Sequence, residues 1–178
     1  MTRQIWRESK CLLHPVKAKL IIFDVDGTLR RCVMHKGPCH SDEGQWEVAP
    51  GVKEVIAQYA WGDTVEMAIA TNQGGIELGH RSMQSCHQQL HQLLINTLWL
   101  PYPRGGIHVC PHYTTPCFCR KPAPGMLFAA IERLKREGFD LILADDVLFV
   151  GDSHDDAMAA ARAGISFLNA EEFFGWGV

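Results

Sequence analysis

Two aspartates separated by a single residue follow an apolar run of this sequence. Residues 20–23 have the length and the β-branched and aromatic composition of a buried strand, and Asp24, Asp26 and Gly27 come directly after them. In an open α/β sheet, ligands bind at the carboxyl ends of the strands, so we expect both carboxylates at the edge of a site. The alternative is an ordinary Asp-Gly turn that ends a strand.

Further carboxylates follow another apolar run, residues 147–150. Asp152 and Asp156 come soon after it, and we expect the ends of these two strands to be adjacent in the sheet, close to Asp24 and Asp26. Several carboxylates in one place repel each other unless a divalent cation holds them, and oxygen ligands of this kind suit Mg²⁺. The sequence therefore predicts a magnesium site built from these aspartates.

A hydroxyl and a cation are expected at the same edge. Thr71 follows a third apolar run and precedes a Gly-rich turn with backbone N–H groups, and Lys121 offers a point charge, so together they suit a phosphoryl group. Asp24 can accept that group and form an aspartyl-phosphate. Asp26 is placed to protonate the leaving oxygen and later to activate water. The residues therefore predict a phosphoester hydrolase that works in two steps.

Four of the remaining polar residues have the spacing of a zinc site. Within the zinc loop, residues 110–119, the pattern C-x-H-x4-C-x-C is formed by Cys110, His112, Cys117 and Cys119. Three thiols and an imidazole suit tetrahedral Zn²⁺, and four protein ligands leave no open position, so the zinc is expected to be structural. It would hold the segment that carries the next two residues, 120 and 121. Unliganded thiols are the alternative.

Alternating strands and helices must position these groups. Apolar runs at residues 65–70, 107–110 and 165–168 join those already named as expected strands, and helices are expected over residues 50–60, 81–100, 124–138 and 157–163. Right-handed crossovers place helices on both faces of such a sheet. The fold class is therefore α/β, a Rossmann-like, doubly wound parallel sheet.

The length of 178 residues and a hydrophobic fraction of 47% predict one domain over residues 1–178. Residues 1–17 are expected to be a lead-in. Residues 30–46 are expected to be a flap-like loop over the site, whose cations meet an anionic substrate; the alternative is a solvated basic loop. These cations are Arg30, Arg31, His35 and Lys36.

Two weaker groups of residues have no settled role. One is a candidate second metal group without a familiar zinc spacing, formed by Cys32, His35, Cys39 and His40. The other is the C-terminal aromatic group of Phe173, Phe174 and Trp176, for which we expect packing over the sheet rather than a partner-binding patch.

Composition excludes several classes of protein. A net charge of −3 and a pI of about 6.3 give no global field for nucleic acid. The sequence has no secretory h-region and no run of 18 apolar residues, so we expect a cytoplasmic protein that does not enter membranes. Seven cysteines in such a protein favour metal ligands or buried thiols over disulfides. The oligomeric state is not specified.

Four motifs in this order resemble the haloacid dehalogenase superfamily of phosphatases. They are Asp24-Val25-Asp26-Gly27-Thr28-Leu29, Thr71-Asn72, Lys121, and Gly151-Asp152 with Asp156. The resemblance implies a Rossmann-like core, Asp24 as nucleophile and Asp26 as general acid/base. It also implies Mg²⁺ held by Asp24, the Asp26 carbonyl and Asp152, with Asp156 or Asp155 in support.

The zinc pattern, together with residues 71–76 and 119–127, resembles the histidinol-phosphate and heptose-bisphosphate phosphatase group. The resemblance implies a small phosphorylated substrate, such as a sugar phosphate or histidinol phosphate. Thr71, Asn72, Arg120 and Lys121 would bind its phosphoryl group. Neither interval in which the superfamily inserts a cap has room for a large one, so we expect an open site.

Two other functions stay open at this stage. The group commonly has Arg before the glycine that follows its second motif, whereas this chain has Leu78-Gly79. The first two motifs also resemble the 3′-phosphatase domain of polynucleotide kinase-phosphatases, which would make a nucleic-acid end the substrate. A non-catalytic receiver-like domain also uses a phosphorylated Asp, a Thr and a Lys, but the proton-transferring Asp26 favours turnover.

Overall fold

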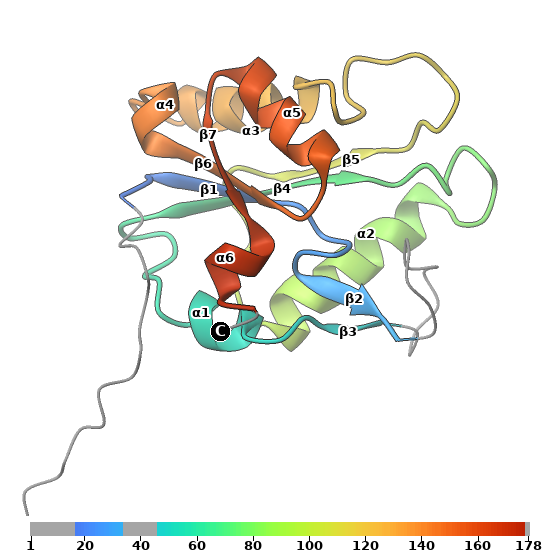
Figure 1. Ribbon diagram of the computed structural model, residues 1–178, viewed down its shortest axis with the longest axis horizontal. Helices are drawn as coiled ribbons and strands as arrows, with labels where there is room; N and C mark the ends of the chain where they lie inside the picture. Colours follow the sequence, from blue (N-terminus) through green and yellow to red (C-terminus); the bar gives the residue numbers. More distant parts are fainter. Residues whose placement is uncertain (1–16, 34–45, 177–178) are drawn as a thin grey trace, which may run out of the picture.

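The computed structural model describes residues 17–33 and 46–176, and its centre is a five-stranded, entirely parallel sheet (Figure 1). Its strands, in spatial order, are β5 (Ile107–Cys110), β4 (Glu66–Asn72), β1 (Leu20–Phe23), β6 (Val147–Gly151) and β7 (Ser166–Asn169). The predicted α/β, doubly wound sheet is confirmed. Its middle strand, β1, is buried along its whole length.

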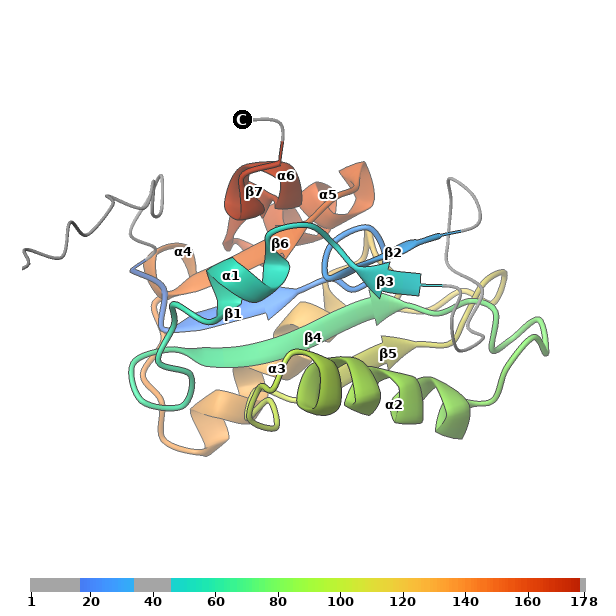
Figure 2. The ribbon, with the colours of Figure 1, turned by 90° about the horizontal axis from the view of Figure 1, so that it is seen from below.

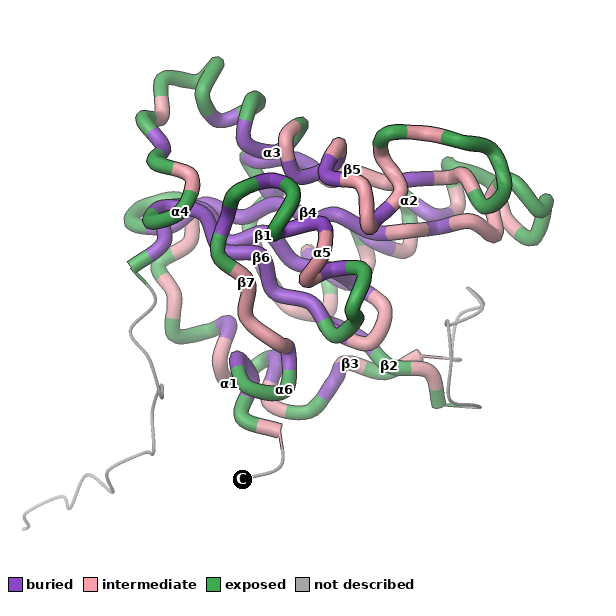
Figure 3. Tube along the Cα trace, turned by 45° about the horizontal axis from the view of Figure 1, so that its top comes forward, coloured by how far each residue is buried: buried purple, intermediate pink, exposed green. Residues whose placement is uncertain are grey.

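Helices cover both faces of the sheet (Figures 1 and 2). One face carries α3 (Gly125–Arg136), α4 (Leu143–Asp146) and α5 (His154–Ala163), and the other carries α1 (Val52–Ile56), α2 (Met83–His91), the π-helix η1 (Gln92–Thr97) and α6 (Ala170–Phe174). Side-chain alternation along β1 divides the core accordingly: Ile21 and Phe23 pack with the second set, and Leu20 and Ile22 with the first. Figure 3 shows the central strands β4, β1 and β6 largely buried in the middle of the molecule.

The expected helix over residues 81–100 differs most from the structure. It begins where the Ser82 hydroxyl accepts a hydrogen bond from the Ser85 N–H at 3.0 Å, and α2 then gives way to the π-helix η1. The chain leaves η1 through Trp99, whose φ of 52° is left-handed. Apolar spacing alone does not distinguish these hydrogen-bond patterns, and it gave no signal for the short helices α4 and α6.

The predicted flap-like loop over residues 30–46 begins and ends in short strands. Short strands β2 (Arg30–Cys32) and β3 (Trp46–Val48) pair in antiparallel fashion and set Arg31 opposite Glu47, with Nη2 and Oε1 2.6 Å apart. Three residues per strand are too few to show an alternating pattern. Residues 34–45 lie outside the described part, as do three members of the candidate second metal group and the lead-in up to residue 16.

The C-terminal aromatic group packs onto the sheet, as predicted. Phe173 and Phe174 are buried, and the Phe173 ring centroid lies 5.6 Å from that of Phe23 in β1. The indole N–H of Trp176 donates to the carbonyl of Pro50 at the start of α1. Among the described residues, no helix has the length and apolar character needed to cross a membrane.

Candidate active site

Three strands end at one edge of the sheet and bring the predicted residues together there. Asp24 follows β1, Thr71 lies at the end of β4, and Asp152 follows β6, which pairs with β1. Because all three strands are parallel, their carboxyl ends lie on the same side of the molecule (Figure 2). Asp24 and Thr71 are buried, whereas Asp152 is exposed.

Lys121 lies between two of the aspartates. Its Nζ is 2.5 Å from Oδ1 of Asp24 and 2.6 Å from Oδ1 of Asp156, and it also donates to the Ala70 carbonyl at 3.0 Å. Burial by itself lowers the pKa of Lys121, but the two carboxylates outweigh it and raise that pKa above its usual value. Lys121 therefore stays protonated.

Negative charge exceeds positive charge around Asp24. Burial raises the pKa of Asp24 to about 7; the Lys121 ammonium opposes this rise, and the Asp156 carboxylate adds to it. Burial and Asp156 also raise the pKa of Asp152. One oxygen of each of these three carboxylates lies within 4.8 Å of the others. Such a cluster of oxygen ligands fits a divalent cation such as Mg²⁺.

Two other predicted ligands lie apart from the carboxylate cluster: Asp26, expected to bind through its backbone carbonyl, and Asp155, expected only in support. The Asp26 side chain is not part of it, and Asp155 is exposed on α5 and does not belong to it either. Asp156 is fixed by the helix start, because its Oδ2 accepts from the Ser153 N–H at 3.1 Å and the Ser153 hydroxyl at 2.6 Å.

A glycine lets the turn after β1 approach the carboxylate cluster. Gly27 has a φ of +94°, and a Cβ placed there would come within 2.1 Å of Oδ2 of Asp152. Both facts exclude a side chain. The Asp-Gly turn is therefore shaped by the site as well as by the strand end.

Asn72 holds Lys121 in place. Its side-chain Nδ2 donates to the Lys121 carbonyl at 3.0 Å, and its Oδ1 accepts from the Lys121 N–H at 3.0 Å. This pair of bonds ties the end of β4 to a segment 49 positions later in the chain. Asn72 thus fixes the backbone of Lys121 next to the end of β4.

The two cations of residues 30–46 that the structure describes, Arg30 and Arg31, both pair with carboxylates. Arg30 is 1% exposed and donates from Nε to Oδ1 of Asp26 at 2.7 Å, while its guanidinium lies 5.5 Å from the centre of the Trp46 ring. Arg31 pairs with Glu47 on the hairpin surface. A carboxylate close to each guanidinium competes with an anionic substrate for its charge, and only the Arg31 pair lies within the hairpin itself. His35 and Lys36 lie outside the described residues.

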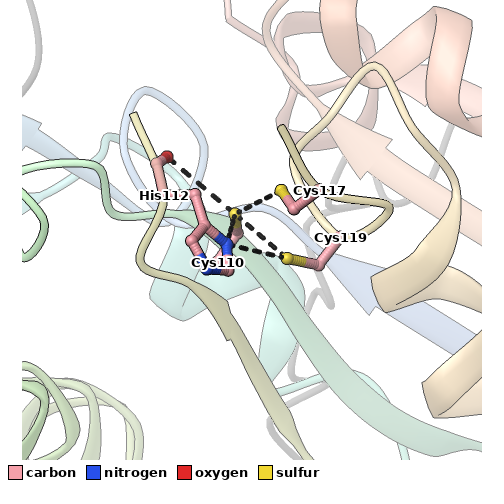
Figure 4. Close-up of side chains that lie close together, drawn as sticks. All are labelled: Cys110, His112, Cys117 and Cys119. Carbon is pink, nitrogen blue, oxygen red and sulfur yellow. Dashed lines mark hydrogen bonds between the residues drawn. The ribbon is translucent and has the colours of Figure 1, made fainter. Parts of the chain in front are cut away.

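The four predicted zinc ligands converge at the end of β5 (Figure 4). The sulfur of Cys110 lies 3.7 Å from that of Cys117 and 3.3 Å from that of Cys119, and Nδ1 of His112 lies 3.4 Å from the Cys119 sulfur. Two sulfurs on a tetrahedral zinc, each about 2.3 Å from the metal, are about 3.8 Å apart. The spacing therefore fits Zn²⁺ with little movement.

Comparison with known proteins shows the family. A family model described as polynucleotide kinase 3 phosphatase matches residues 19–174. The D-glycero-beta-D-manno-heptose-1,7-bisphosphate 7-phosphatase of Bordetella bronchiseptica is 34% identical over 156 residues, covering 82% of this chain and 76% of that protein. The enzyme of the same name from Pseudomonas putida is 35% identical over 155 residues, covering 82% of this chain and 78% of that protein.

A solved structure agrees with these relatives. The D,D-heptose 1,7-bisphosphate phosphatase from B. bronchiseptica, complexed with magnesium and phosphate, superposes with a TM-score of 0.64 at 30% identity, covering 84% of this chain and 78% of that one. The chain belongs to the haloacid dehalogenase phosphatases. Within that superfamily it falls in the heptose-bisphosphate group, so the receiver-like alternative is set aside.

The zinc loop of this haloacid dehalogenase phosphatase is held by a residue that sequence reasoning missed. The carboxylate of Glu77, in the turn after β4, accepts from the backbone N–H groups of Tyr113, Thr114 and Thr115 and from both threonine hydroxyls. These hydrogen bonds lower the pKa of Glu77 to about 2, the largest contribution coming from the Thr115 hydroxyl. We name this set of contacts the Glu77 clasp.

Arg120, predicted to bind the phosphoryl group, is engaged within the zinc loop. Its Nη1 donates to the His112 carbonyl at 2.7 Å, and its guanidinium lies 5.5 Å from the centre of the Tyr113 ring. A Cβ at Gly74 would come within 2.9 Å of that ring and 3.2 Å of Arg120 Nη1. The turn after β4, which contains Gly74, and the zinc loop therefore lie in close contact at this glycine.

Two more residues that contact the predicted site were not predicted from the sequence. The Thr28 hydroxyl lies 3.3 Å from Oδ2 of Asp24, and Gln73, 3% exposed, bonds to both Asp26 and Thr71. Both residues lie inside motifs whose other members had been assigned roles. Only the alternation of side chains along an extended strand end, which sets Thr71 and Gln73 on one side, could have indicated Gln73.

Proposed function

We propose that this haloacid dehalogenase phosphatase is a Mg²⁺-dependent phosphomonoester hydrolase in which Asp24 is the nucleophile. The observation that carries the proposal is the environment of Asp24: its carboxylate is buried at the end of β1, next to the Lys121 ammonium and the Thr28 hydroxyl. A carboxylate fixed in this way, beside a cation for the phosphoryl oxygens, suits in-line attack on phosphorus.

The reaction has two balanced steps. An Asp24 oxygen attacks phosphorus, the bond between phosphorus and the leaving oxygen breaks, and Asp26 gives that oxygen a proton. Water then attacks the aspartyl-phosphate, Asp26 takes up the water proton, and the bond between phosphorus and Asp24 breaks. Lys121 and the Thr71 hydroxyl stabilise the charge on the phosphoryl oxygens during both steps.

Asp24, Asp152 and Asp156 would hold the magnesium ion, with the Asp26 carbonyl as a further ligand. When bound, Mg²⁺ neutralises the repulsion between the carboxylates and the phosphoryl group. The compact cluster of carboxylate oxygens supports this assignment, as does the relative complexed with magnesium and phosphate.

We also propose a structural Zn²⁺ at Cys110, His112, Cys117 and Cys119. All four ligand positions are filled by the protein, and the distances between sulfurs fit a tetrahedral site. Thiols that bind zinc must stay reduced, which fits a reducing compartment such as the cytoplasm.

The substrate class that we favour is a small sugar phosphate. The relatives with 34% and 35% identity are named heptose-1,7-bisphosphate 7-phosphatases, and they match this chain over 82% of its length. A heptose bisphosphate is therefore the first compound to test. Leu78, 49% exposed in the turn after β4, is a departure from the arginine common in that group, so histidinol phosphate and other sugar phosphates belong in the same panel.

A second candidate function is polynucleotide 3′-phosphatase, because the matching family model carries that description. Such a substrate would need cations along several phosphates. Among the described residues of the hairpin, Arg30 is buried and both arginines are paired with carboxylates. We therefore rank it second.

One panel tests both. Purified protein with Mg²⁺ is assayed on heptose 1,7-bisphosphate, other sugar phosphates, histidinol phosphate and a 3′-phosphorylated oligonucleotide, with Asp24→Asn as the inactive control. We expect a sugar phosphate to give the highest kcat/KM. An oligonucleotide preferred by about a hundredfold, a gap of roughly 2.7 kcal/mol, with a steep salt dependence, would favour the second function. Substantial activity of Asp24→Asn would overturn the nucleophile.

A further inference from the structure

Both carboxylate oxygens of Asp26 are held by side chains from other elements. Oδ1 accepts from Nε of Arg30, in β2, and Oδ2 accepts from Nε2 of Gln73, which follows β4, each at 2.7 Å. Arg30 is 1% exposed and Gln73 is 3% exposed, so water does not compete strongly for either bond. A carboxylate oxygen has two lone-pair positions, so each oxygen can still carry or receive a proton.

The same amide group of Gln73 reaches a second functional side chain. Its Nε2 also donates to Oγ1 of Thr71 at 2.8 Å. An amide nitrogen carries two hydrogens, so one serves Asp26 and the other serves Thr71. Because the Thr71 oxygen accepts this bond, its own hydrogen is left to donate to a phosphoryl oxygen.

These contacts restrict the rotation of the Asp26 side chain. A free aspartate side chain rotates about two bonds, whereas this one is fixed by a neutral donor on one oxygen and a guanidinium on the other. Catalysis by a general acid depends on its position within hydrogen-bond reach of the leaving oxygen, and small displacements of reacting groups are costly.

We propose that Gln73 and Arg30 are positioning residues for phosphoryl transfer: together they aim Asp26 at the leaving oxygen, and Gln73 also turns the Thr71 hydroxyl hydrogen toward the phosphoryl group. This inference rests on the proposed function, in which Asp26 protonates the leaving oxygen. Neither residue touches the reacting atoms; each acts through a residue that does.

The nature of the leaving group separates positioning from a purely structural role. An alkoxide must receive a proton as it departs, whereas nitrophenolate departs as an anion and needs none. The value of kcat/KM covers the steps up to transfer of the phosphoryl group. A misplaced Asp26 therefore lowers kcat/KM much more for a sugar phosphate than for p-nitrophenyl phosphate.

The variant that tests the proposal is Gln73→Glu, which keeps the shape of the side chain but cannot donate to Asp26 or Thr71 when ionised. The matched control is Gln84→Glu, at an exposed position of α2, which adds the same charge. Arg30→Lys is a second variant, because it keeps the charge but loses the fixed guanidinium geometry. Circular dichroism and thermal unfolding check that each variant is folded.

We expect Gln73→Glu to lower kcat/KM for the sugar phosphate by about a hundredfold. The ratio of that value to the value for p-nitrophenyl phosphate should fall by at least about tenfold, with a smaller fall in the same direction for Arg30→Lys and none for Gln84→Glu. Equal losses on both substrates in folded Gln73→Glu and Arg30→Lys would overturn the inference.

Asp26→Asn distinguishes failure of this inference from failure of the proposed function. If Asp26→Asn changes the ratio and the other two variants do not, only the positioning role is wrong. If Asp26→Asn itself loses activity equally on both substrates, Asp26 is not the general acid, and the proposed mechanism fails together with the inference.

Discussion

Lys121 donates to Oδ1 of Asp24 across a distance of 2.5 Å, although 97 positions separate the two residues in the chain. The contact closes the site between the first strand and the segment that follows the zinc loop. Asp156 shares the same ammonium at 2.6 Å. One cation therefore serves two buried carboxylates, and its removal takes away the ammonium that both share.

Lys121→Met tests this relationship. Breaking a buried ion pair by removing one partner costs about 3 kcal/mol or more, because the remaining charge stays buried. We expect the free energy of unfolding to fall by that amount in urea denaturation with EDTA, and turnover to fall by about 10²–10³-fold. The control is Lys135→Met, at an exposed position of α3. Equal stabilities of the two variants would contradict the prediction.

Metal analysis tests the zinc cluster. After exhaustive dialysis in a mild buffer, we expect close to one equivalent of zinc per chain, while magnesium exchanges freely. The double variant Cys117→Ser/Cys119→Ser should lose the zinc and unfold at a lower temperature, because a closed zinc site contributes free energy of folding. Cys86→Ala, which removes a buried thiol outside the cluster, should keep the metal. A double variant with unchanged stability would exclude a structural role.

The sheet and the position of the site were readable from the sequence because they depend on local signals. Buried runs in β1 and β6 are continuous and end at Asp or Gly-Asp, and parallel strands must bring those ends to one edge. The zinc cluster was readable for a similar reason, since four ligands lie within ten residues.

The contacts of individual polar side chains could not be predicted in the same way. Nothing in the spacing of Arg30 shows that it is buried against Asp26, since an arginine beside an acidic site is equally suited to a substrate. Glu77 looks like a surface residue, and it is one by exposure; its role comes from three N–H groups of the zinc loop, 36 to 38 positions later. Such partners appear only when the fold brings them together.

The Glu77 clasp predicts local protection of the zinc loop. Glu77→Gln removes the negative charge and one acceptor oxygen, so we expect the N–H groups of Thr114 and Thr115 to exchange with deuterium faster, by about tenfold. Hydrogen exchange of the zinc-loaded protein, followed by mass spectrometry or NMR, measures this. Glu132→Gln, at an exposed position of α3, serves as the control. Unchanged exchange in Glu77→Gln would show that zinc alone orders the loop.

The last prediction concerns acid stability and lies away from the site, at the amino ends of β1 and β6. Asp146 accepts from the Ile142 N–H at 2.8 Å and from Nζ of Lys19 at 3.1 Å. The Ile142 hydrogen bond, followed by that from Lys19, lowers the pKa of Asp146 below its ordinary value of 3.8.

The sign follows from proton uptake. As the pH falls, the unfolded chain protonates this carboxyl first, so its contribution to stability is complete above its ordinary pKa and is lost as the pH falls through the lowered folded value. Asp146→Asn keeps an acceptor for the Ile142 N–H but has no charge to lose. We therefore expect the wild type to exceed Asp146→Asn in free energy of unfolding near neutral pH, with the difference shrinking below about pH 4. Urea unfolding across this pH range measures the difference in free energy of unfolding. Asp145→Asn, at an exposed neighbouring position, is the control. A difference that stays constant down to the lowest pH would show that the lowered pKa of Asp146 does not stabilise the fold.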